Sequence, residues 1–387
     1  MSGQLGKFTI MGKFIYKRTL YSSIEKWLFK GKIIILYGPR QVGKTTLVKQ
    51  LMEHYPQSYY LNCERQAVKD LLASVNPEKI LRFVGNVRIV IFDEAQKIKK
   101  IGEVLKLLID TYPEVQYIAT GSSSFQLSDK VSEPLTGRNL KFLLFPLSLN
   151  ELLQQYALLS LVEKLSDLLR FGSYPDIVDR PESEQMLLLD ELSSDYLFRD
   201  ILLFDNIKHS ETLVKLLKAI ALQIGNEVSF RELGNLVGLS VETVQRYLQL
   251  LEKSFVLFSL PSFSRNLRNE IARSRKFYFY DLGVRNSLIQ NYSLLENRTD
   301  KGALWENFCI VSRMQFLRAK GVKANMYFWR TYRQKEIDLI EEYGGRLKAF
   351  EFKYSYRKVK LPVQFMEAYP DTSFQVIHKE NFVDFLL

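Results

Sequence analysis

The stretch Gly38-Pro39-Arg40-Gln41-Val42-Gly43-Lys44-Thr45 fills every fixed position of the phosphate-loop pattern G-x-x-x-x-G-K-[ST]. The apolar run Ile33–Tyr37 stands directly before it and predicts a buried strand that leads into the loop. Backbone N–H groups of such a loop surround the β-phosphate of a nucleotide, and the helix that begins near Lys44 points its positive end at the same anion. The stretch therefore predicts a nucleoside triphosphate site.

Individual side chains of this site have predicted roles. Lys44 is expected to place its charge between the β- and γ-phosphates, and Thr45 to ligate Mg²⁺ through its hydroxyl. A second apolar run, residues 88–94, ends in the carboxylates of Asp93 and Glu94. Because a buried parallel strand opens onto the site at its C-terminal end, Asp93 is predicted to hold Mg²⁺ and Glu94 to orient the attacking water. The expected cofactors are ATP and Mg²⁺.

A third predicted strand, residues 115–120, leads into a row of hydroxyl side chains. Thr120 and Ser122 are candidates for sensors of the γ-phosphate, and the alternative is an ordinary loop of Ser and Gly. Arg138 follows in a turn-like stretch. One interpretation makes Arg138 an arginine finger, acting in its own subunit or on a neighbour in a homo-oligomer, and the other makes it a solvated surface residue.

Four short motifs follow one another along the first part of the chain. They are Tyr37-Gly38-Pro39-Arg40-Gln41-Val42-Gly43-Lys44-Thr45-Thr46, Phe92-Asp93-Glu94-Ala95-Gln96, Thr120-Gly121-Ser122-Ser123, and Leu135-Thr136-Gly137-Arg138 with Phe145-Pro146-Leu147-Ser148. Together they resemble the prokaryotic AAA-type ATPases that carry a C-terminal domain of unknown function, family 4143. The resemblance spans nearly the whole chain and implies an ATPase core, with nucleotide contacts from Gly38 through Thr46. It implies no substrate.

Length and composition limit the class of protein. At 387 residues, with 47% hydrophobic and 25% charged residues, the chain is typical of a soluble globular protein of two to four units. No apolar run reaches the roughly 18 to 20 residues of a membrane span, and the start lacks the apolar core of a signal peptide, so a cytoplasmic location without membrane contact is expected. Two cysteines and three histidines are too few for a disulfide framework or a zinc module. A net charge of +11 favours an anionic partner such as DNA, and the alternative is a basic surface without a partner.

The pattern of apolar residues divides the chain into four units. Strand-like and helix-like segments alternate over residues 1–148, which predicts an α/β fold with a parallel-sheet, AAA-type core after an N-terminal segment. Helical spacing over residues 149–225 predicts a lid. Residues 226–295 predict a winged helix-turn-helix, with Ser240 as the cap of its second helix. Residues 296–387 predict a smaller α/β domain that resembles nucleases.

The winged helix carries the predicted DNA surface. The exposed face of its second helix presents Gln245 and Arg246, and the stretch between its two strands adds four basic side chains, Arg265, Arg268, Arg273 and Arg275. Lys and Arg side chains that neutralise phosphates release counterions and so favour DNA binding. Winged helices also serve as protein-packing modules, so DNA contact and a packing role both remain open.

The last unit holds a second group of acidic and basic side chains. Successive side chains of a strand alternate, so Glu351 and Lys353 share a face. If Asp338 on the neighbouring strand lies opposite them, two carboxylates can hold Mg²⁺ beside Lys353. The order Glu306, Asp338, Glu351-x-Lys353 resembles the PD-(D/E)xK nuclease superfamily, with Ile337 in place of its proline, and implies metal-dependent DNA cleavage. The alternative is the same fold kept as a scaffold without catalysis.

Three functions are therefore in competition. The favoured one is ATP-dependent action on DNA. A rival from another class is a nucleotide-operated switch that binds a protein partner, in which the nuclease-like fold is only a scaffold. A third function keeps DNA binding without cleavage. DNA-stimulated ATP hydrolysis separates the switch from the other two, and metal-dependent nicking separates those two from each other.

Overall fold

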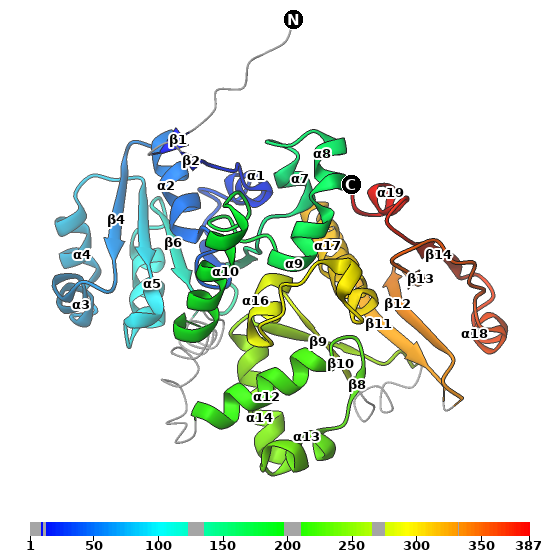
Figure 1. Ribbon diagram of the computed structural model, residues 1–387. Helices are drawn as coiled ribbons and strands as arrows, with labels where there is room; N and C mark the ends of the chain where they lie inside the picture. The colour runs from blue at the N-terminus through cyan, green and yellow to red at the C-terminus, as the bar shows by residue number, and fades with distance from the viewer. Residues whose placement is uncertain (1–8, 11–12, 123–134, 197–209, 265–274, 332) are drawn as a thin grey trace, which may run out of the picture.

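The computed structural model describes six stretches of the chain: residues 9–10, 13–122, 135–196, 210–264, 275–331 and 333–387. Beyond the short hairpin of β1 (Thr9–Ile10) and β2 (Lys13–Phe14), these stretches form three sheets with the helices around them. Figure 1 shows the sheets as three separate groups, with helices α9 (Leu165–Phe171), α16 (Leu282–Leu288) and α17 (Lys301–Ala319) between them.

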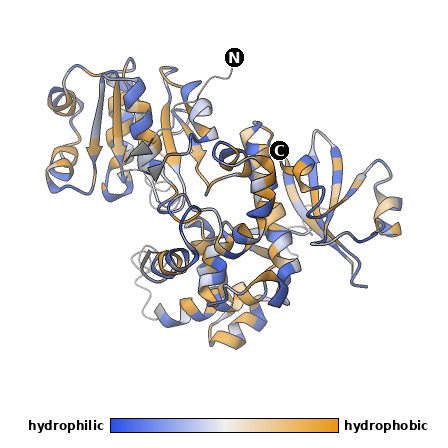
Figure 2. Ribbon diagram, turned by 45° about the horizontal axis from the view of Figure 1, so that its top comes forward, coloured by the Kyte–Doolittle hydropathy of each residue, from blue (hydrophilic) through white to orange (hydrophobic). Residues whose placement is uncertain are grey.

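The first sheet has five strands in the order β4-β5-β6-β3-β7, and every neighbouring pair is parallel. The strands are β3 (Ile33–Tyr37), β4 (Ser58–Asn62), β5 (Ile89–Asp93), β6 (Gln116–Gly121) and β7 (Asn139–Leu143). All residues of β3, β5 and β6 are buried, and Figure 2 shows these central strands mostly in the orange of apolar residues. Such burial on both faces is typical of parallel sheets covered by helices. The predicted α/β fold with a parallel core is confirmed.

The described residues of this first unit include the helices α1 (Thr19–Glu25), α2 (Lys44–His54), α3 (Gln66–Ala73), α4 (Pro77–Val84) and α5 (Ile101–Thr111). Their buried apolar side chains complete two cores, which lie on opposite faces of the sheet because alternate residues of β3 belong to each. The strands run parallel, so β3, β5 and β6 all end at the same edge of the sheet. The predicted site residues follow these three ends.

The segment after the first sheet is helical, as its apolar spacing predicts. It contains α7 (Leu149–Leu152), α8 (Leu158–Glu163), α9, α10 (Glu182–Glu191), a π-helical turn (Leu192–Tyr196) and α12 (Ser210–Leu222). A capping box of Ser148 and Glu151 begins α7, since each side chain bonds the backbone N–H of the other residue. No helix in the described stretches has the length and apolar character that crossing a membrane requires.

The second sheet is antiparallel, in the order β8-β10-β9, with β8 (Glu227–Val228), β9 (Leu257–Pro261) and β10 (Arg275–Phe279). Two helices, α13 (Phe230–Val237) and α14 (Val241–Lys253), lie between β8 and β9 in the chain. Gly238 ends α13 at φ +73°, and the Ser240 hydroxyl accepts the Thr243 N–H at 3.2 Å to begin α14. The two helices lie where the sequence predicts them, and the winged helix-turn-helix of residues 226–295 stays a prediction.

The third sheet has the order β11-β12-β13-β14, with β11 (Asn325–Arg330), β12 (Glu336–Tyr343), β13 (Arg346–Phe352) and β14 (Ser373–Ile377). The first two pairs are antiparallel and the last is parallel. Helix α17 precedes the sheet, α18 (Val363–Ala368) connects β13 to β14, and α19 (Phe382–Leu386) ends the chain. Trp305 of α17 is fully buried and donates its indole N–H to the Ile377 carbonyl at 3.2 Å, which fixes the helix on the sheet.

Helix α16 packs tightly against α9 at a glycine. A Cβ atom added to Gly283 would lie 2.1 Å from the backbone oxygen of Phe171, far inside any normal contact. We therefore expect Gly283→Ala to destabilise the protein by about 1–3 kcal/mol, because backbone atoms on both sides must shift. Thermal unfolding followed by circular dichroism measures the effect as a lower Tm.

Gly302 provides the matched control for Gly283. It also lies in a helix, α17, but no atom is found within 4 Å of its added Cβ. Gly302→Ala is expected to stabilise the protein slightly, since Ala is favoured over Gly in helices by about 1 kcal/mol. Equal Tm changes in the two variants would contradict the close contact between α9 and α16.

Candidate nucleotide site

The phosphate loop connects β3 to α2, and its two fixed glycines have conformations that other residues rarely adopt. Gly38 lies at φ +154°, and a Cβ atom there would sit 2.3 Å from the Leu144 oxygen. Gly43 lies at φ +93° and forms the N-cap of α2. The glycines of the pattern are therefore required by the backbone as well as by the close approach of a phosphate.

Lys44 and Thr45, the last residues of the pattern, point toward the loop and toward β5. The Lys44 side chain is buried and its ammonium donates to the backbone oxygens of Gly38 at 2.9 Å and Pro39 at 2.7 Å. The Thr45 hydroxyl donates to Asp93 Oδ2 at 2.9 Å. A hydroxyl and a carboxylate side by side are the hard oxygen ligands that Mg²⁺ prefers, so Thr45 and Asp93 fit the metal of a nucleotide complex.

Asp93 is held in place by two further hydroxyl groups. Thr120 donates to its Oδ1 atom and Tyr60 to its Oδ2 atom, both in short hydrogen bonds. The Thr120 hydroxyl also accepts the backbone N–H of Glu94 at 3.1 Å. Thr120 thus contacts the acidic pair, and its predicted role as a phosphate sensor stays a prediction. Tyr60 of β4 lies in no sequence motif. It reaches the site because β4 pairs with β5, with Asn62 opposite Asp93.

Glu94 follows β5 in an αL conformation, at φ +53°. The Gln96 side-chain amide donates to Glu94 Oε2 and, at 3.1 Å, to the hydroxyl of Ser122. Burial raises the pKa of Glu94, whereas the Lys44 ammonium and the Gln96 amide oppose that rise. A carboxylate that is partly desolvated and fixed by an amide suits the orientation of a water molecule. Gln96 lies within one of the sequence motifs, but the motif alone predicts no role for it.

A cleft of about 460 Å³ lies over the phosphate loop. Its floor is formed by Arg40, Gln41, Val42, Gly43, Lys44, Thr45 and Thr46, with Glu94 beside them. The cleft is also lined by Ile15, Tyr16 and Arg18 of the segment before α1, by Leu147, and by Pro175 and Asp176 of the helical unit. The predicted nucleotide-binding positions from Arg40 to Thr46 therefore line one cavity, which segments distant in sequence enclose.

Arg18 is a site residue that sequence reasoning misses. Its guanidinium is buried and donates to the backbone oxygens of Val42 and Phe145, each at 2.5 Å. Its Nε atom lies 3.1 Å from the carboxylate of Glu151 in α7. One arginine thus joins the phosphate loop to the helical unit. No local pattern marks it, because all its partners are more than 20 residues away in the chain.

The structure does not bring Arg138 to the phosphate loop. Its backbone oxygen accepts the N–H of Ile33 at the start of β3, whereas the loop follows the other end of that strand. The two ends of β3 are about 15 Å apart, since a strand extends by about 3.3 Å per residue. The Arg138 side chain forms an ion pair with Asp110 at 2.7 Å. The prediction that Arg138 acts on phosphate in its own subunit is therefore wrong, and a role on a neighbouring subunit stays a prediction.

The predicted DNA-binding residues are only partly described. Gln245 and Arg246 are exposed on α14, and the Arg246 guanidinium lies 5.6 Å from the centre of the Tyr247 ring. Arg275 begins β10, is half-buried, and donates to the Ser259 hydroxyl at 3.4 Å. The other three predicted residues, Arg265, Arg268 and Arg273, lie outside the described residues.

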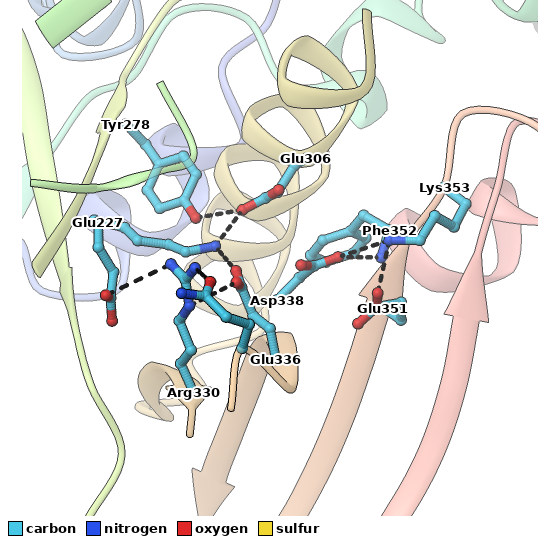
Figure 3. Close-up of polar contacts among 11 residues, drawn as sticks. Glu227, Tyr278, Glu306, Arg330, Glu336, Asp338, Glu351, Phe352 and Lys353 are labelled. Atoms are coloured by element: carbon cyan, nitrogen blue, oxygen red, sulfur yellow. Dashed lines mark hydrogen bonds and ion pairs between the residues drawn. The ribbon is translucent and has the colours of Figure 1, made fainter. Parts of the chain in front are cut away.

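The acidic and basic residues of the C-terminal sheet do meet (Figure 3). Leu339 pairs with Phe350, and this register continued by one residue sets Asp338 opposite Glu351. Asp338 Oδ2 accepts the Phe352 N–H at 2.7 Å. The Lys353 ammonium lies 2.6 Å from Glu351 Oε1 and 3.9 Å from Asp338 Oδ2. The predicted trio is therefore brought to one point at the ends of β12 and β13.

Glu306 adds a third carboxylate to this C-terminal cluster. It accepts from the Tyr278 hydroxyl at 2.6 Å, and the Lys276 ammonium lies 3.2 Å away. Burial raises the pKa of Asp338 well above its usual range, and the charges of Glu306 and Glu351 raise it further. Burial also raises the pKa of Glu351, although the hydrogen bond from Lys353 opposes that rise.

A resident metal does not fit the C-terminal cluster as it is arranged. Asp and Glu oxygens suit a hard divalent cation by their chemistry. Within the described stretches, however, no three Asp, Glu, His or Cys side chains are placed to hold a metal ion together. The ammonium groups of Lys353 and Lys276 already contact the carboxylates of Glu351 and Glu306. The predicted metal role of Asp338 and Glu351 stays a prediction.

Comparison with known proteins finds relatives of the chain and a solved structure with a similar fold. Relatives of unassigned function cover most of the chain: an uncharacterized protein of Mycobacterium tuberculosis is 28% identical over 342 residues, which are 88% of this chain and 74% of the relative. One of Methanocaldococcus jannaschii is 26% identical over 347 residues, covering 84% and 75%. The solved Walker-type ATPase of Pyrococcus abyssi aligns with a TM-score of 0.50 at 16% identity, covering 71% of this chain and 96% of that one. At that identity the likeness concerns the fold alone.

Family models match three consecutive segments. A family described only as a domain of unknown function, DUF8612, matches residues 162–295. The family described as an AAA domain matches residues 30–153, and another domain of unknown function, DUF4143, matches residues 301–383. The resemblance to AAA-type ATPases with a family 4143 terminus is confirmed for these two segments: the chain contains an AAA domain with the fold of a P-loop ATPase, followed by DUF4143.

Proposed function

We propose that this protein binds and hydrolyses ATP at the phosphate loop. The observation that carries the proposal is the contact of Thr45 with Asp93 at 2.9 Å, directly beside the half-buried Glu94. The phosphate-loop motif, at the start of α2, thereby meets the acidic motif at the end of β5. The AAA domain and the Walker-type fold support the same conclusion.

Each side chain of the cleft has a distinct part in the proposed reaction. Lys44 and the loop N–H groups bind the phosphates, and Thr45 and Asp93 hold Mg²⁺, which neutralises phosphate charge when bound. Glu94 orients the water that attacks the γ-phosphorus and accepts hydrogen bonds from it. Gln96 fixes the carboxylate of Glu94 and keeps it aimed into the cleft. Thr120 and Ser122 connect this acidic pair to the end of β6.

The helical unit is the proposed lid. Pro175 and Asp176 line the same cleft as the phosphate loop, and Arg18 connects Val42 of that loop to Glu151 of α7. A change at the phosphates can thus be transmitted to the helices through one guanidinium. Domain closure around a nucleotide is a common way to convert phosphate state into movement. The proposed arginine finger, Arg138, would act on a neighbouring subunit of a homo-oligomer.

We further propose DNA as the macromolecular partner, bound by residues 226–295 as a winged helix in the cytoplasm. The net charge of +11 and the exposed Gln245 and Arg246 on a Ser-capped second helix support this partner. The test is the ATPase rate with and without duplex, single-stranded and branched DNA, in Mg²⁺ and then in Mn²⁺. A higher rate with DNA is expected. An unchanged rate with all three would favour the rival function, a switch for a protein partner.

Arg246 gives a sharper test of the DNA surface. Arg246→Ala is expected to weaken DNA binding and to reduce the slope of log K against log salt by about 1, because one phosphate contact is lost. Binding is measured by fluorescence anisotropy over a series of salt concentrations. Lys106→Ala, an exposed residue of α5 in the first unit, is the control and should leave the slope unchanged. An unaltered slope in Arg246→Ala would remove α14 from the DNA surface.

A second candidate function, metal-dependent DNA cleavage, is favoured by one observation. Asp338, Glu351 and Lys353 converge at the ends of two adjacent strands, in the order of the PD-(D/E)xK superfamily. The engaged ammonium of Lys276 favours the opposite interpretation, a scaffold without catalysis. Cleavage by the wild-type chain and its loss in variants of the trio would decide between them.

A further inference from the structure

The buried side chain of Lys276, on strand β10, extends into the C-terminal domain. Lys276 belongs to the antiparallel sheet of residues 227–279, yet its side chain is only 1% exposed and ends among carboxylates of the third sheet and of α17. Its ammonium lies 3.2 Å from Glu306 Oε1 and forms a second, shorter ion pair with Glu336. Its charge also acts on Asp338, where it opposes the rise in pKa that burial and the neighbouring carboxylates cause.

Other contacts also join the second sheet to the C-terminal domain. Tyr278, two residues along β10, donates its hydroxyl to Glu306 at 2.6 Å (Figure 3). Arg330 of β11 lies 3.5 Å from Glu227 of β8 and 3.6 Å from Glu336. Beyond β9, the Phe263 N–H donates to the Phe328 oxygen at 2.6 Å. The second sheet is thus fastened to the C-terminal domain through polar groups around the carboxylate cluster.

Burial of this lysine requires carboxylate partners. An ammonium removed from water loses several kcal/mol of hydration, which only close and well-hydrogen-bonded carboxylates can offset. Burial alone would lower the pKa of Lys276, but the charges of Glu306, Glu336 and Asp338 outweigh it and hold the pKa above its ordinary value. Lys276 is therefore a fixed positive charge within the cluster. It neutralises part of the negative charge of Glu306 and Glu336.

We propose that Lys276 is an internal cation that occupies the metal's place at Glu306, and we call its ion pairs with Glu306 and Glu336 the latch on the C-terminal centre. Mg²⁺ or Mn²⁺ and the Lys276 ammonium then exclude one another at this centre. This inference rests on the second candidate function only in treating Asp338 and Glu351 as a metal-binding pair. It explains why the predicted trio is assembled while the described residues contain no three-ligand set placed to hold a metal.

Binding of Mn²⁺ to the full chain without nucleotide tests the latch, by electron paramagnetic resonance of the free ion. Lys276→Met keeps the length of the side chain and removes the charge, and it is expected to raise the affinity for Mn²⁺ by about tenfold or more, because like-charge repulsion at close range is lost. Lys276→Arg should bind Mn²⁺ as weakly as the wild type. The matched control, Lys348→Met, removes an exposed lysine of β13 and should change nothing.

A second substitution assigns the gained binding to the right centre. Adding Asp338→Asn to Lys276→Met should return the Mn²⁺ affinity to the wild-type value. If Lys276→Met does not fold, Glu336→Gln provides the alternative, since it removes one of the two ion pairs that hold the ammonium and should raise the affinity by a smaller factor. A folded Lys276→Met or Glu336→Gln with wild-type Mn²⁺ affinity would overturn the latch.

The outcome for the latch is distinguishable from the outcome for cleavage. Gained Mn²⁺ binding without cleavage of any DNA supports the latch and contradicts the nuclease function. Cleavage by the wild type, with no gain of Mn²⁺ binding in Lys276→Met, supports the nuclease function and contradicts the latch.

Discussion

Glu94→Gln is expected to lower kcat for ATP hydrolysis by about 10²- to 10⁴-fold and to change nucleotide affinity by no more than about threefold. The amide keeps the shape of the side chain but cannot draw a proton from the attacking water. Glu94 lines the cleft, and the Gln96 amide already fixes the orientation of its side chain. The substitution therefore removes mainly a contribution to the chemical step. Steady-state turnover and isothermal titration with a slowly hydrolysed ATP analogue measure the two quantities separately.

Lys44→Ala should behave in the opposite way. Its ammonium lies over the loop, within 2.9 Å of the Gly38 oxygen, where the phosphates of a bound nucleotide are expected. The loss of this ground-state contact should weaken nucleotide binding itself. Lys106→Ala, on an exposed face of α5, controls for the loss of a positive charge. If Lys44→Ala and Glu94→Gln lost affinity equally, the division of roles between the two residues would be wrong.

The phosphate loop and the acidic strand were predictable because their information is local. A strand of apolar residues, two glycines and a lysine with a threonine lie within 13 residues, and each is required by the backbone or by the phosphates. The acidic pair is equally local, since it must follow a buried parallel strand. Arg18 and Tyr60 escaped prediction because their partners are distant in the chain and no spacing rule connects them.

The error at Arg138 has a simple geometric cause. In a parallel sheet the site lies beyond the C-terminal ends of the strands, whereas a residue that immediately precedes a strand lies at the opposite edge. Arg138 precedes β7, so nearness in sequence to a motif did not mean nearness to the phosphates. Lys276 shows the converse case. It lies in a different unit from Glu306, and only the packing of β10 on α17 brings the two together.

The C-terminal trio was predictable in part. Alternation along a strand places Glu351 and Lys353 on one face, and the turn at Gly344 and Gly345 makes β12 and β13 neighbours. The register that sets Asp338 opposite Glu351 follows from the length of that turn. The sequence could not show that Glu306 would already be paired with Lys276, because that ion pair depends on contacts between units.

Asp338→Asn and Lys353→Met are each expected to reduce metal-dependent DNA cleavage by at least about 100-fold, if the trio is a working centre. Asn is preferred to Ala at position 338 because its amide oxygen can still accept the Phe352 N–H, which is bonded at 2.7 Å. ATP hydrolysis without DNA should be nearly unchanged, since the trio and the phosphate loop belong to different sheets. Nicking of supercoiled DNA in Mg²⁺ and in Mn²⁺ is the measurement.

The latch determines how this cleavage test must be run. With Lys276 in place, the wild type is expected to cleave slowly, so each variant is compared in both the wild-type and the Lys276→Met background. Glu342→Gln alters a carboxylate on the same strand, β12, away from the trio, and should leave cleavage intact. Cleavage that appears only with Lys276→Met and disappears with Asp338→Asn would assign the reaction to this centre. Absence of cleavage in both backgrounds, with every DNA form and both metals, would instead make the C-terminal domain a scaffold and favour the switch.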